Sequence, residues 1–279
     1  MKRILVPTDF SPTAEKAFRF ALDIATKAKG TVILYHVYTP VESPFIDTGQ
    51  KSKQYNTQTE TNLVKRLQRL KKKVTADTAD VPVSTVLGRT PIIDNILGFA
   101  ADNQIDLIVM GTQGGNGLKK AIVGSVAASI VEKTDIPVLL VPEKFEWTEP
   151  ERVVFITNYL QTDRQALSVV LALAKLYGAA VTVVHLVDVF AKEEKEKIDF
   201  DTYAYALHRE LNEFNLKFKL LKTASVTETM ENLYKETSYD MLAMVRRKKS
   251  FLEKFFIKSF TQNMAYVTNH PLLVVPEEV

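Results

Sequence analysis

A chain of 279 residues is near the upper limit for a single hydrophobic core, so two domains of about 140 residues each are the better expectation. Hydrophobic residues make up 46% of the chain and charged residues 25%, which is a globular composition, and a net charge of only +3 argues against a nucleic-acid-coating protein. The chain has no cysteine, which excludes disulfides and thiol catalysis, and no apolar run near the roughly 18 residues that span a bilayer, so we expect a soluble cytoplasmic protein without a membrane segment.

The first elements of the chain are expected to be a buried strand and an amphipathic helix. Residues 3–8 are almost continuously apolar, as in a strand that is covered on both faces. In residues 11–30 apolar side chains recur at helical spacing, Ser11 or Thr13 can cap the first turn, and Gly30 ends the pattern. The sequence therefore opens with a strand and a crossover helix.

Strands and helices continue to alternate up to residue 142. A strand over residues 31–37 is followed by a polar loop from Thr39 to about Gln58, and then by a helix over residues 61–76. The next elements are a strand, a helix, a strand, a helix and a strand, over residues 81–87, 90–104, 106–110, 125–134 and 137–142.

This alternation predicts the fold class, because strands that are joined by crossover helices must be mostly parallel, with helices on both faces. Open sheets of five such strands most often have the order 3-2-1-4-5 or 2-1-3-4-5, and we predict an α/β fold with the first order. In that order the loops after the first and fourth strands are neighbours at the carboxyl edge of the sheet, where ligands bind.

An internal repeat indicates that the second half of the chain is a copy of the first. Residues 3–18 align without gaps with residues 152–167, and at the same offset His36 aligns with His185. At a shorter offset "PVLLVPE", from Pro137, aligns with "PLLVVPE", from Pro271. We therefore predict two tandem doubly wound domains, residues 1–146 and 147–279, each an open five-stranded, mostly parallel sheet.

Glycines are concentrated between the fourth strand and the fourth helix of the first half. Gly111 and Gly114 let the main chain turn and approach a ligand, while Gly124 and Ser125 open a helix whose first N–H groups and dipole favour an anion. The segment suits phosphate groups, but glycines also mark ordinary surface turns, and spacing alone leaves both interpretations open. The segment matches neither a P-loop nor a dinucleotide-binding fingerprint.

The pattern Gly-x-x-Gly, nine residues, Gly-Ser resembles the signature of the ATP-binding branch of the universal stress protein family. "ILVPTDFS", "LYHVY" and "IPVLLVPE" are similar to the family's first, second and fifth strands, and the resemblance covers both halves. It implies a site for ATP, or for AMP or ADP, with Mg²⁺ as a further candidate ligand. The residues that the resemblance assigns to this site are Pro7, Thr8, Asp9, Val37, Met110, Gly111, Gly114, Gly124, Ser125 and Val126.

Asp9 is the polar anchor that the resemblance implies for the ribose, and it has a second interpretation as the cap of the first helix. The second half departs from the pattern, because Asn158 replaces Asp9 and Val245 replaces Gly111. The other departures are Ile156 for Pro7, Lys248 for Gly114 and Lys258 for Gly124, whereas Ser259 preserves Ser125. We expect the second half to have lost the nucleotide site, although the basic run from Arg246 to Lys249 could hold an anion by its side chains.

No catalytic residue and no metal ligand set is evident in the sequence. A protein that senses or carries ATP is the first hypothesis, a slow Mg²⁺-dependent ATPase that uses Asp9 is the second, and a nucleotide-free scaffold that binds a protein partner is the third. Members of the family dimerise near the fifth strand, so the resemblance implies that the two fifth strands of this chain pair as an intramolecular pseudo-dimer. A homodimer is a further expectation.

Overall fold

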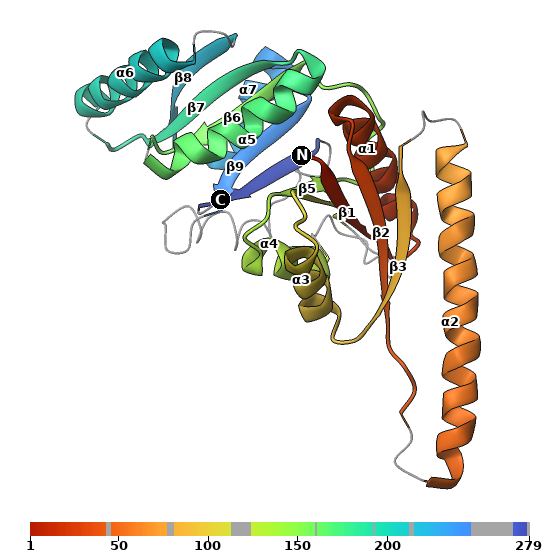
Figure 1. The fold of residues 1–279 in the computed structure, drawn as a ribbon. Coiled ribbons are helices and arrows are strands. Elements are labelled where there is room, and N and C mark those ends of the chain that lie inside the picture. The colour runs from red at the N-terminus through yellow and green to blue at the C-terminus, as the bar shows by residue number, and fades with distance from the viewer. Residues whose placement is uncertain are drawn as a thin grey trace. The chain divides into compact units, whose positions relative to one another are not determined.

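The structure, a computed structural model, describes residues 1–42, 46–76, 81–112, 124–159, 161–191, 193–211, 215–246 and 270–277. These residues form two compact units, one with the described residues up to Thr134 and one with those from Asp135 onward. Strands and helices alternate in both units, which confirms the predicted fold class of two tandem α/β domains (Figure 1). The two units meet at residues 134 and 135, earlier in the chain than the predicted domain boundary at residue 146. That boundary describes the repeat in the sequence and stays a prediction.

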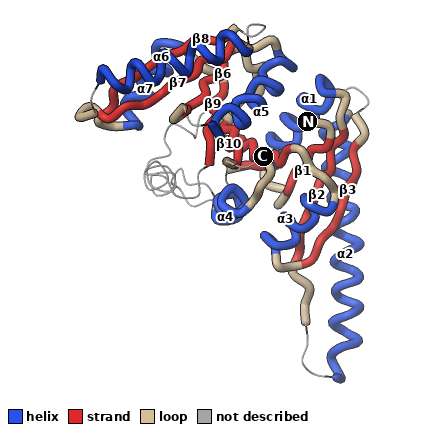
Figure 2. The backbone as a smooth tube through the Cα atoms, turned by 60° about the vertical axis from the view of Figure 1, so that its left-hand side comes forward, coloured by secondary structure: helices blue, strands red, loops and turns tan. Residues whose placement is uncertain are grey.

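The first unit contains four parallel strands in the order β3-β2-β1-β4. Helices α1 and α2 pack against one another, as do α3 and α4, and both pairs cover the sheet (Figure 2). The chain order of these elements is β1 (Arg3–Pro7), α1 (Pro12–Ala28), β2 (Thr31–Tyr38), α2 (Ile46–Thr75), β3 (Val83–Arg89), α3 (Ile92–Asp102), β4 (Leu107–Gly111) and α4 (Ser125–Lys133).

The two helix pairs lie on opposite faces of this sheet, as two consecutive residues of β2 demonstrate. Tyr35 stacks on Phe99 of α3, whereas His36 contacts Phe10, whose ring lies beneath Arg66 of α2. Because successive side chains of a strand point to opposite faces, α2 and α3 cover different faces. The apolar residues of β1 are fully buried between the layers, as their continuous pattern predicted.

Helix α1 follows the sequence prediction closely. The hydroxyl of Ser11 accepts a hydrogen bond from the N–H of Ala14 and caps the first turn, while Lys29 in the left-handed conformation ends the helix. Gly30 is needed for a different reason, since a Cβ there would lie 2.7 Å from the carbonyl oxygen of Lys2. The tight connection to β2 therefore excludes a side chain at this position.

Helix α2 corrects the prediction of a polar loop up to Gln58, because the helix already begins at Ile46 and runs for 30 residues. At about 1.5 Å per residue it is roughly 45 Å long and extends beyond the strands (Figure 1). The first half of α2 lacks the stripe of apolar residues by which an amphipathic helix is recognised in a sequence. It is tied down instead by Asn56, whose side-chain oxygen and nitrogen bond the main chain of Val41 at 2.8 and 2.9 Å.

The second unit contains six strands in the order β5-β10-β9-β6-β7-β8, of which the last five repeat the predicted order 3-2-1-4-5 from the other end. Strand β5 is the fifth strand of the first repeat, yet it joins this unit because it pairs antiparallel with β10. The family resemblance implied this pairing of the two fifth strands. The elements are β5 (Val138–Val141), β6 (Arg152–Thr157), α5 (Gln161–Tyr177), β7 (Ala180–Asp188), α6 (Glu193–Glu210), β8 (Leu216–Thr223), α7 (Val226–Thr237), β9 (Met241–Arg246) and β10 (Leu272–Pro276).

Each repeat anchors the start of its first strand with the same carboxylate. Asp106 accepts hydrogen bonds from the main-chain N–H groups of Lys2 and Arg3 at 2.5 and 2.9 Å. Its counterpart Asp240 accepts them from Glu151 and Arg152 at 3.0 and 2.9 Å. Within the part of the chain that the structure describes, no helix is long and apolar enough to cross a membrane.

Candidate functional site

The candidate site is the carboxyl edge of the sheet in the first unit, where the direction of winding reverses between β1 and β4. Strand β1 ends at Pro7 and continues into Thr8 and Asp9, Val37 is the second-last residue of β2, and Met110 and Gly111 end β4. Because β2, β1 and β4 are parallel neighbours, their ends share one edge. Six of the ten residues assigned from the sequence thus come from three adjacent strand ends.

The loop after β1 is held in a defined shape by its own short polar side chains. The carboxylate oxygen Oδ1 of Asp9 accepts the N–H of Ser11 at 2.9 Å, and the hydroxyl of Thr8 accepts the N–H of Phe10 at 3.0 Å. Asp9 is exposed, while Pro7 and Thr8 are buried. The interpretation of Asp9 as the helix cap was wrong, because Ser11 fills that role.

Phe10 and His36 form a wall of this edge that the sequence assignment did not include. The main chain of Phe10 has a φ of 64°, a left-handed conformation that costs a residue with a side chain about 1 kcal/mol or more. Its ring centroid lies 4.5 Å from that of His36, and the guanidinium carbon of Arg66 lies 4.1 Å from the Phe10 ring centre. The signals in the sequence were the aromatic residue repeated at Phe10 and Tyr159 and the histidine repeated at His36 and His185.

Burial, partly opposed by the carbonyl of Thr8, lowers the pKa of His36. The positive charge of Arg66 acts in the same direction as burial, and the negative charge of Asp9 acts against it. Since both charges act on this imidazole, Asp9 and Arg66 gather at the same end of the strands as His36. The histidine is therefore neutral at pH 7 and part of a mixed aromatic and polar rim.

Gly111 has a steric requirement that is independent of any ligand. A Cβ at this position would lie 2.8 Å from the methyl carbon of Thr13 and 3.1 Å from the main-chain carbonyl carbon of the same residue. The contact fixes the close approach of α1 to the end of β4. Gly111 is thus explained by helix packing, which the sequence assignment to a phosphate did not foresee.

The N-terminus of α4 lies directly against the end of β4, since the N–H of Gly124 donates to the carbonyl oxygen of Thr112 at 2.5 Å. Gly124 is the N-cap residue and has no side chain that could cap the helix. The first turn of α4 also contains no acidic residue. Ser125 is exposed and Val126 half-buried in this turn. By contrast, α1 and α7 are capped by Ser11 and Ser225 and carry a glutamate in their first turns.

An uncapped helix start of this kind presents N–H donors and the positive end of the helix dipole to an anion. Gly114 lies outside the described residues, so nine of the ten assigned residues have a position. All nine belong to the same edge of the first unit, from the ends of β1, β2 and β4 and from the start of α4. This edge can offer main-chain donors, one hydroxyl and one exposed carboxylate to a ligand.

At the corresponding edge of the second unit, the loop after β6 is stabilised by different side chains from those of the loop after β1. Asp163, at the position of Ala14, is fully buried and accepts hydrogen bonds from the hydroxyl of Thr157 and the N–H of Asn158, both at 2.7 Å. Ile156 and Asn158 occupy the positions of Pro7 and Asp9 in the repeat. The loop after β6 is therefore held by a buried carboxylate, whereas the matching loop after β1 contains the exposed carboxylate of Asp9.

Side chains from α6 close over this second edge. The hydroxyl of Tyr159 donates to Glu196, whose Oε2 also lies 3.6 Å from Nε2 of His185. The buried rings of Phe200 and Tyr203 pack beside them, with centroids 6.0 Å from His185 and 6.3 Å from Tyr159, respectively. Where the first unit has an exposed Arg66 over its aromatic residue, the second has an apolar and hydrogen-bonded cover.

The remaining departures of the second half lie at the end of β9 and beyond it. Val245 is buried at the position of Gly111, and the side chain of Arg246 is only 9% exposed, with its Nη2 3.7 Å from Oδ1 of Asp135. Three of the residues compared with the first half, Lys248, Lys258 and Ser259, and the run 247–249 lie outside the described residues. Arg246 is thus directed at a carboxylate of its own chain.

Fold and site together define a tandem, doubly wound α/β protein with an anion-suited edge in its first unit. The chain belongs to the universal stress protein family, whose family model matches residues 1–142 and 150–276. Two proteins of Methanocaldococcus jannaschii are similar to half of it. Universal stress protein MJ0577 is 28% identical over 155 residues, which is 51% of this chain and 96% of that protein, and universal stress protein MJ0531 is 32% identical over 141 residues, which is 50% and 81%.

A solved structure matches the chain over its whole length. The crystal structure of a universal stress protein from Archaeoglobus fulgidus has a TM-score of 0.71 and covers 99% of this chain and 98% of its own. The sequence identity is 15%, so this likeness concerns the fold alone.

Proposed function

We propose that the first unit binds an adenine nucleotide, ATP or its products ADP and AMP, and that the protein acts as a nucleotide-dependent sensor or regulator in the stress response. One observation carries the proposal. The uncapped N-terminus of α4 opens at the same strand edge as the exposed carboxylate of Asp9. A nucleotide needs both features, because its phosphates seek N–H donors and a positive dipole while its ribose hydroxyls seek an acceptor.

The division of roles follows from the chemistry of each position. Gly124, Ser125 and Val126 would hold the phosphates through main-chain N–H groups and the serine hydroxyl, with Gly114 beside them. Asp9 would accept from the ribose, Pro7 and Thr8 would lie beside the ribose and base, and Met110 with Gly111 would border the ribose. Val37 would contact the base through its main chain. The second unit would serve without a nucleotide, since α6 covers its edge.

The experiment begins with the purified protein. It is denatured, any released nucleotide is identified by mass, and the stripped protein is titrated with ATP, ADP and AMP, with and without Mg²⁺, by calorimetry. About one nucleotide per chain is the expected stoichiometry, since only the first unit offers the edge. Release of phosphate is followed in the same samples, so that slow turnover through Asp9 and Mg²⁺, the alternative activity, has its own readout.

Gly124→Lys is the sharpest variant, because it copies Lys258 of the second half. Gly124 has a φ of −57° and a ψ of 149°, which a lysine adopts without strain, so the fold should survive while the side chain obstructs the helix start. Asp9→Ala and Asn158→Ala form a matched pair across the repeat. The first should weaken nucleotide binding and the second should leave it unchanged.

Binding that is unaffected by Gly124→Lys, or no binding of any adenine nucleotide, would contradict the proposal. The protein would then fit a nucleotide-free scaffold whose ligand is another protein. A cytoplasmic location and pairing of the two halves as a pseudo-dimer, or of two chains as a homodimer, belong to this proposed role. Size-exclusion chromatography with light scattering checks the number of chains.

A further inference from the structure

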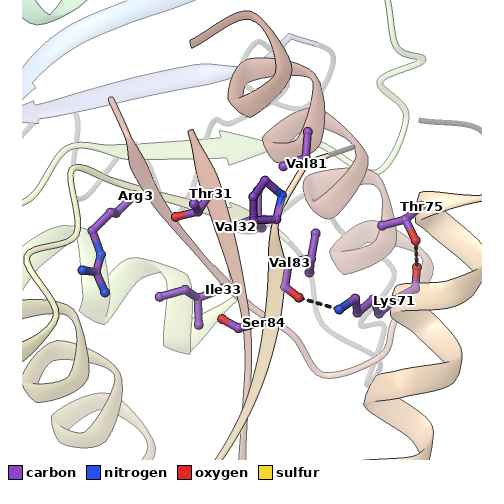
Figure 3. Close-up of a pocket in the computed structure, with 10 residues that line it drawn as sticks. Arg3, Thr31, Val32, Ile33, Lys71, Thr75, Val81, Val83 and Ser84 are labelled. Atoms are coloured by element: carbon purple, nitrogen blue, oxygen red, sulfur yellow. Dashed lines mark hydrogen bonds between the residues drawn. The ribbon is translucent and has the colours of Figure 1, made fainter. Parts of the chain in front are cut away.

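The first unit has a hollow at the opposite edge of its sheet, at the amino ends of β1, β2 and β3. Its volume is about 810 Å³, within the range of roughly 300–1,000 Å³ that is typical of small-molecule sites. Apolar side chains that include Ile33, Val81 and Val83 form part of its lining, and Figure 3 shows Arg3 and Lys71 at opposite sides of it. The proposed nucleotide edge lies at the other ends of β1 and β2, together with the end of β4.

The charges of this lining are one-sided. Arg3 and Lys71 contribute positive charge, and no acidic side chain is among the described residues that line the hollow. Lys71 is already engaged, because its Nζ donates to the carbonyl oxygen of Val83 at 2.5 Å and so ties α2 to the edge strand β3. Lys71 therefore adds to the positive potential of the hollow, while its ammonium group stays bonded to the main chain.

Arg3 is the other cation of the lining, and a comparison with its counterpart in the second repeat indicates that its guanidinium can bind a ligand. Its counterpart Arg152 folds back onto Asp240, with Nη2 3.3 Å from Oδ1 and Nε 3.4 Å from Oδ2. The equivalent carboxylate, Asp106, bonds the main-chain N–H of Arg3 but makes no ion pair with its guanidinium among the described residues. The same arginine thus pairs with its aspartate in the second repeat and lines the hollow in the first.

Two hydroxyls share the face of the sheet with this guanidinium. Arg3 is the register partner of Thr31 and Ile33 that of Ser84, so these four side chains lie on one face of the neighbouring strands. Figure 3 shows the hydroxyl of Thr31 between Arg3 and the strand β2, with Ile33 and Ser84 below it. A guanidinium fork beside the hydroxyl donor of Ser84 and an apolar surface matches an oxyanion that is attached to an apolar body.

We propose that this hollow is a second ligand site, and that it binds a small organic oxyanion, a phosphate monoester or a carboxylate, through the guanidinium of Arg3. The site is independent of the proposed nucleotide edge. Ser84 adds a hydroxyl donor, whereas the hydroxyl of Thr31 already donates to the carbonyl oxygen of Lys2 at 3.4 Å. The apolar residues bury the rest of the ligand. Lys71 keeps the edge strand in place and contributes long-range attraction.

The test uses two probes, phenyl phosphate and benzoate, with benzyl alcohol as the neutral control, and the full chain throughout. Calorimetric titrations compare the wild type with Arg3→Gln and with Arg152→Gln, the matched change in the second repeat. We expect at least one anionic probe to bind the wild type and Arg152→Gln equally, and Arg3→Gln to bind roughly tenfold or more weakly. Benzyl alcohol should give no measurable heat.

A second pair of variants separates this site from the nucleotide edge. Gly124→Lys should leave the affinity for the probe unchanged even if it abolishes ATP binding, and Ser84→Trp, which fills the exposed face of β3, should remove probe binding without touching Arg3. Circular dichroism and the unfolding midpoint show that each variant is folded. Equal affinity of wild type and Arg3→Gln, loss of probe binding in Gly124→Lys, or no binding of either anion would overturn the proposal.

Discussion

The ring nitrogen Nδ1 of His36 lies 2.7 Å from the main-chain carbonyl oxygen of Thr8. The second repeat forms the same bond, between His185 and Thr157, at 2.8 Å. Because a carbonyl only accepts hydrogen bonds, Nδ1 carries a proton in both imidazoles, and in the neutral ring of His36 the unprotonated nitrogen is Nε2. The alignment of His36 with His185 in the sequence thus corresponds to a hydrogen bond that both repeats share.

Burial of His36 makes the stability of the first unit depend on pH. The pKa of His36 lies below its ordinary value of 6.5, so below about pH 6.5 the unfolded chain takes up the proton more readily than the folded one. The free energy of unfolding should therefore fall as the pH drops from about 7 through the folded pKa. Denaturant unfolding at a series of pH values measures this slope.

His36→Asn provides the control for that measurement. An asparagine amide keeps an N–H donor near the carbonyl of Thr8 but does not titrate, so the variant should lose less stability on acidification than the wild type. The pKa of His270 is also lowered, mainly by burial, so part of the slope should remain. An unchanged slope would exclude His36 as its source.

Gly111→Ala tests the packing requirement at the end of β4. The new methyl group would press on Thr13, and overpacking of this kind costs about 1–3 kcal/mol. Gly98→Ala in α3 is the matched control, because nothing lies within 4 Å of its Cβ and alanine favours a helix, so stability should rise by up to about 1 kcal/mol. Chemical denaturation distinguishes the two, and a Gly111→Ala protein as stable as wild type would show that the contact is not tight.

Asp163→Ala should be among the more destabilising single changes in the second unit. It leaves the hydroxyl of Thr157 and the N–H of Asn158 without their acceptor in a fully buried position, at a cost of about 3 kcal/mol. Asp201→Ala, on the exposed face of α6, should change stability by no more than about 0.5 kcal/mol. Equal midpoints for both variants would refute the role of the buried carboxylate.

Asp106→Ala and Asp240→Ala test whether the repeated carboxylate anchors each first strand. Each variant loses two charged hydrogen bonds to main-chain N–H groups, so we expect a loss of about 1–2 kcal/mol for either. Asp240→Ala also breaks the ion pair with Arg152, which at this exposure adds at most about 1 kcal/mol. Amide hydrogen exchange at the starts of β1 and β6 locates the effect, and protection that stays unchanged there would contradict it.

The sequence predicted elements whose signal is local. The buried strand at Arg3–Pro7 and the capped helix that follows Ser11 follow from periodicity and capping. The crossover rules left two strand orders open, and the structure has the first of them. The first half of α2 was missed because its side chains are polar all round, so that no periodic stripe marks it. Its contact with Val41 is tertiary and cannot be seen in a local window.

The candidate site was only partly predictable for the same reason. A motif can place Gly111 and Gly124 beside a phosphate, but it does not reveal that Thr13, almost a hundred residues earlier, already requires a glycine at position 111. Nor does it reveal that Arg66 reaches the ring of Phe10 from another helix. These relationships arise from packing between distant segments, whereas the glycine spacing is a property of one segment.

The antiparallel pair of β5 and β10 means that the repeat in the sequence and the compact unit in the structure do not coincide. A fragment cut at residue 146 would carry β5 without its partner, with Val138, Leu139, Leu140 and Val141 deprived of the burial they now have. Such an exposed apolar edge invites pairing with another copy. Neither half of this chain should therefore be treated as a separable module, and any evolutionary exchange of one half would have to supply a compatible last strand.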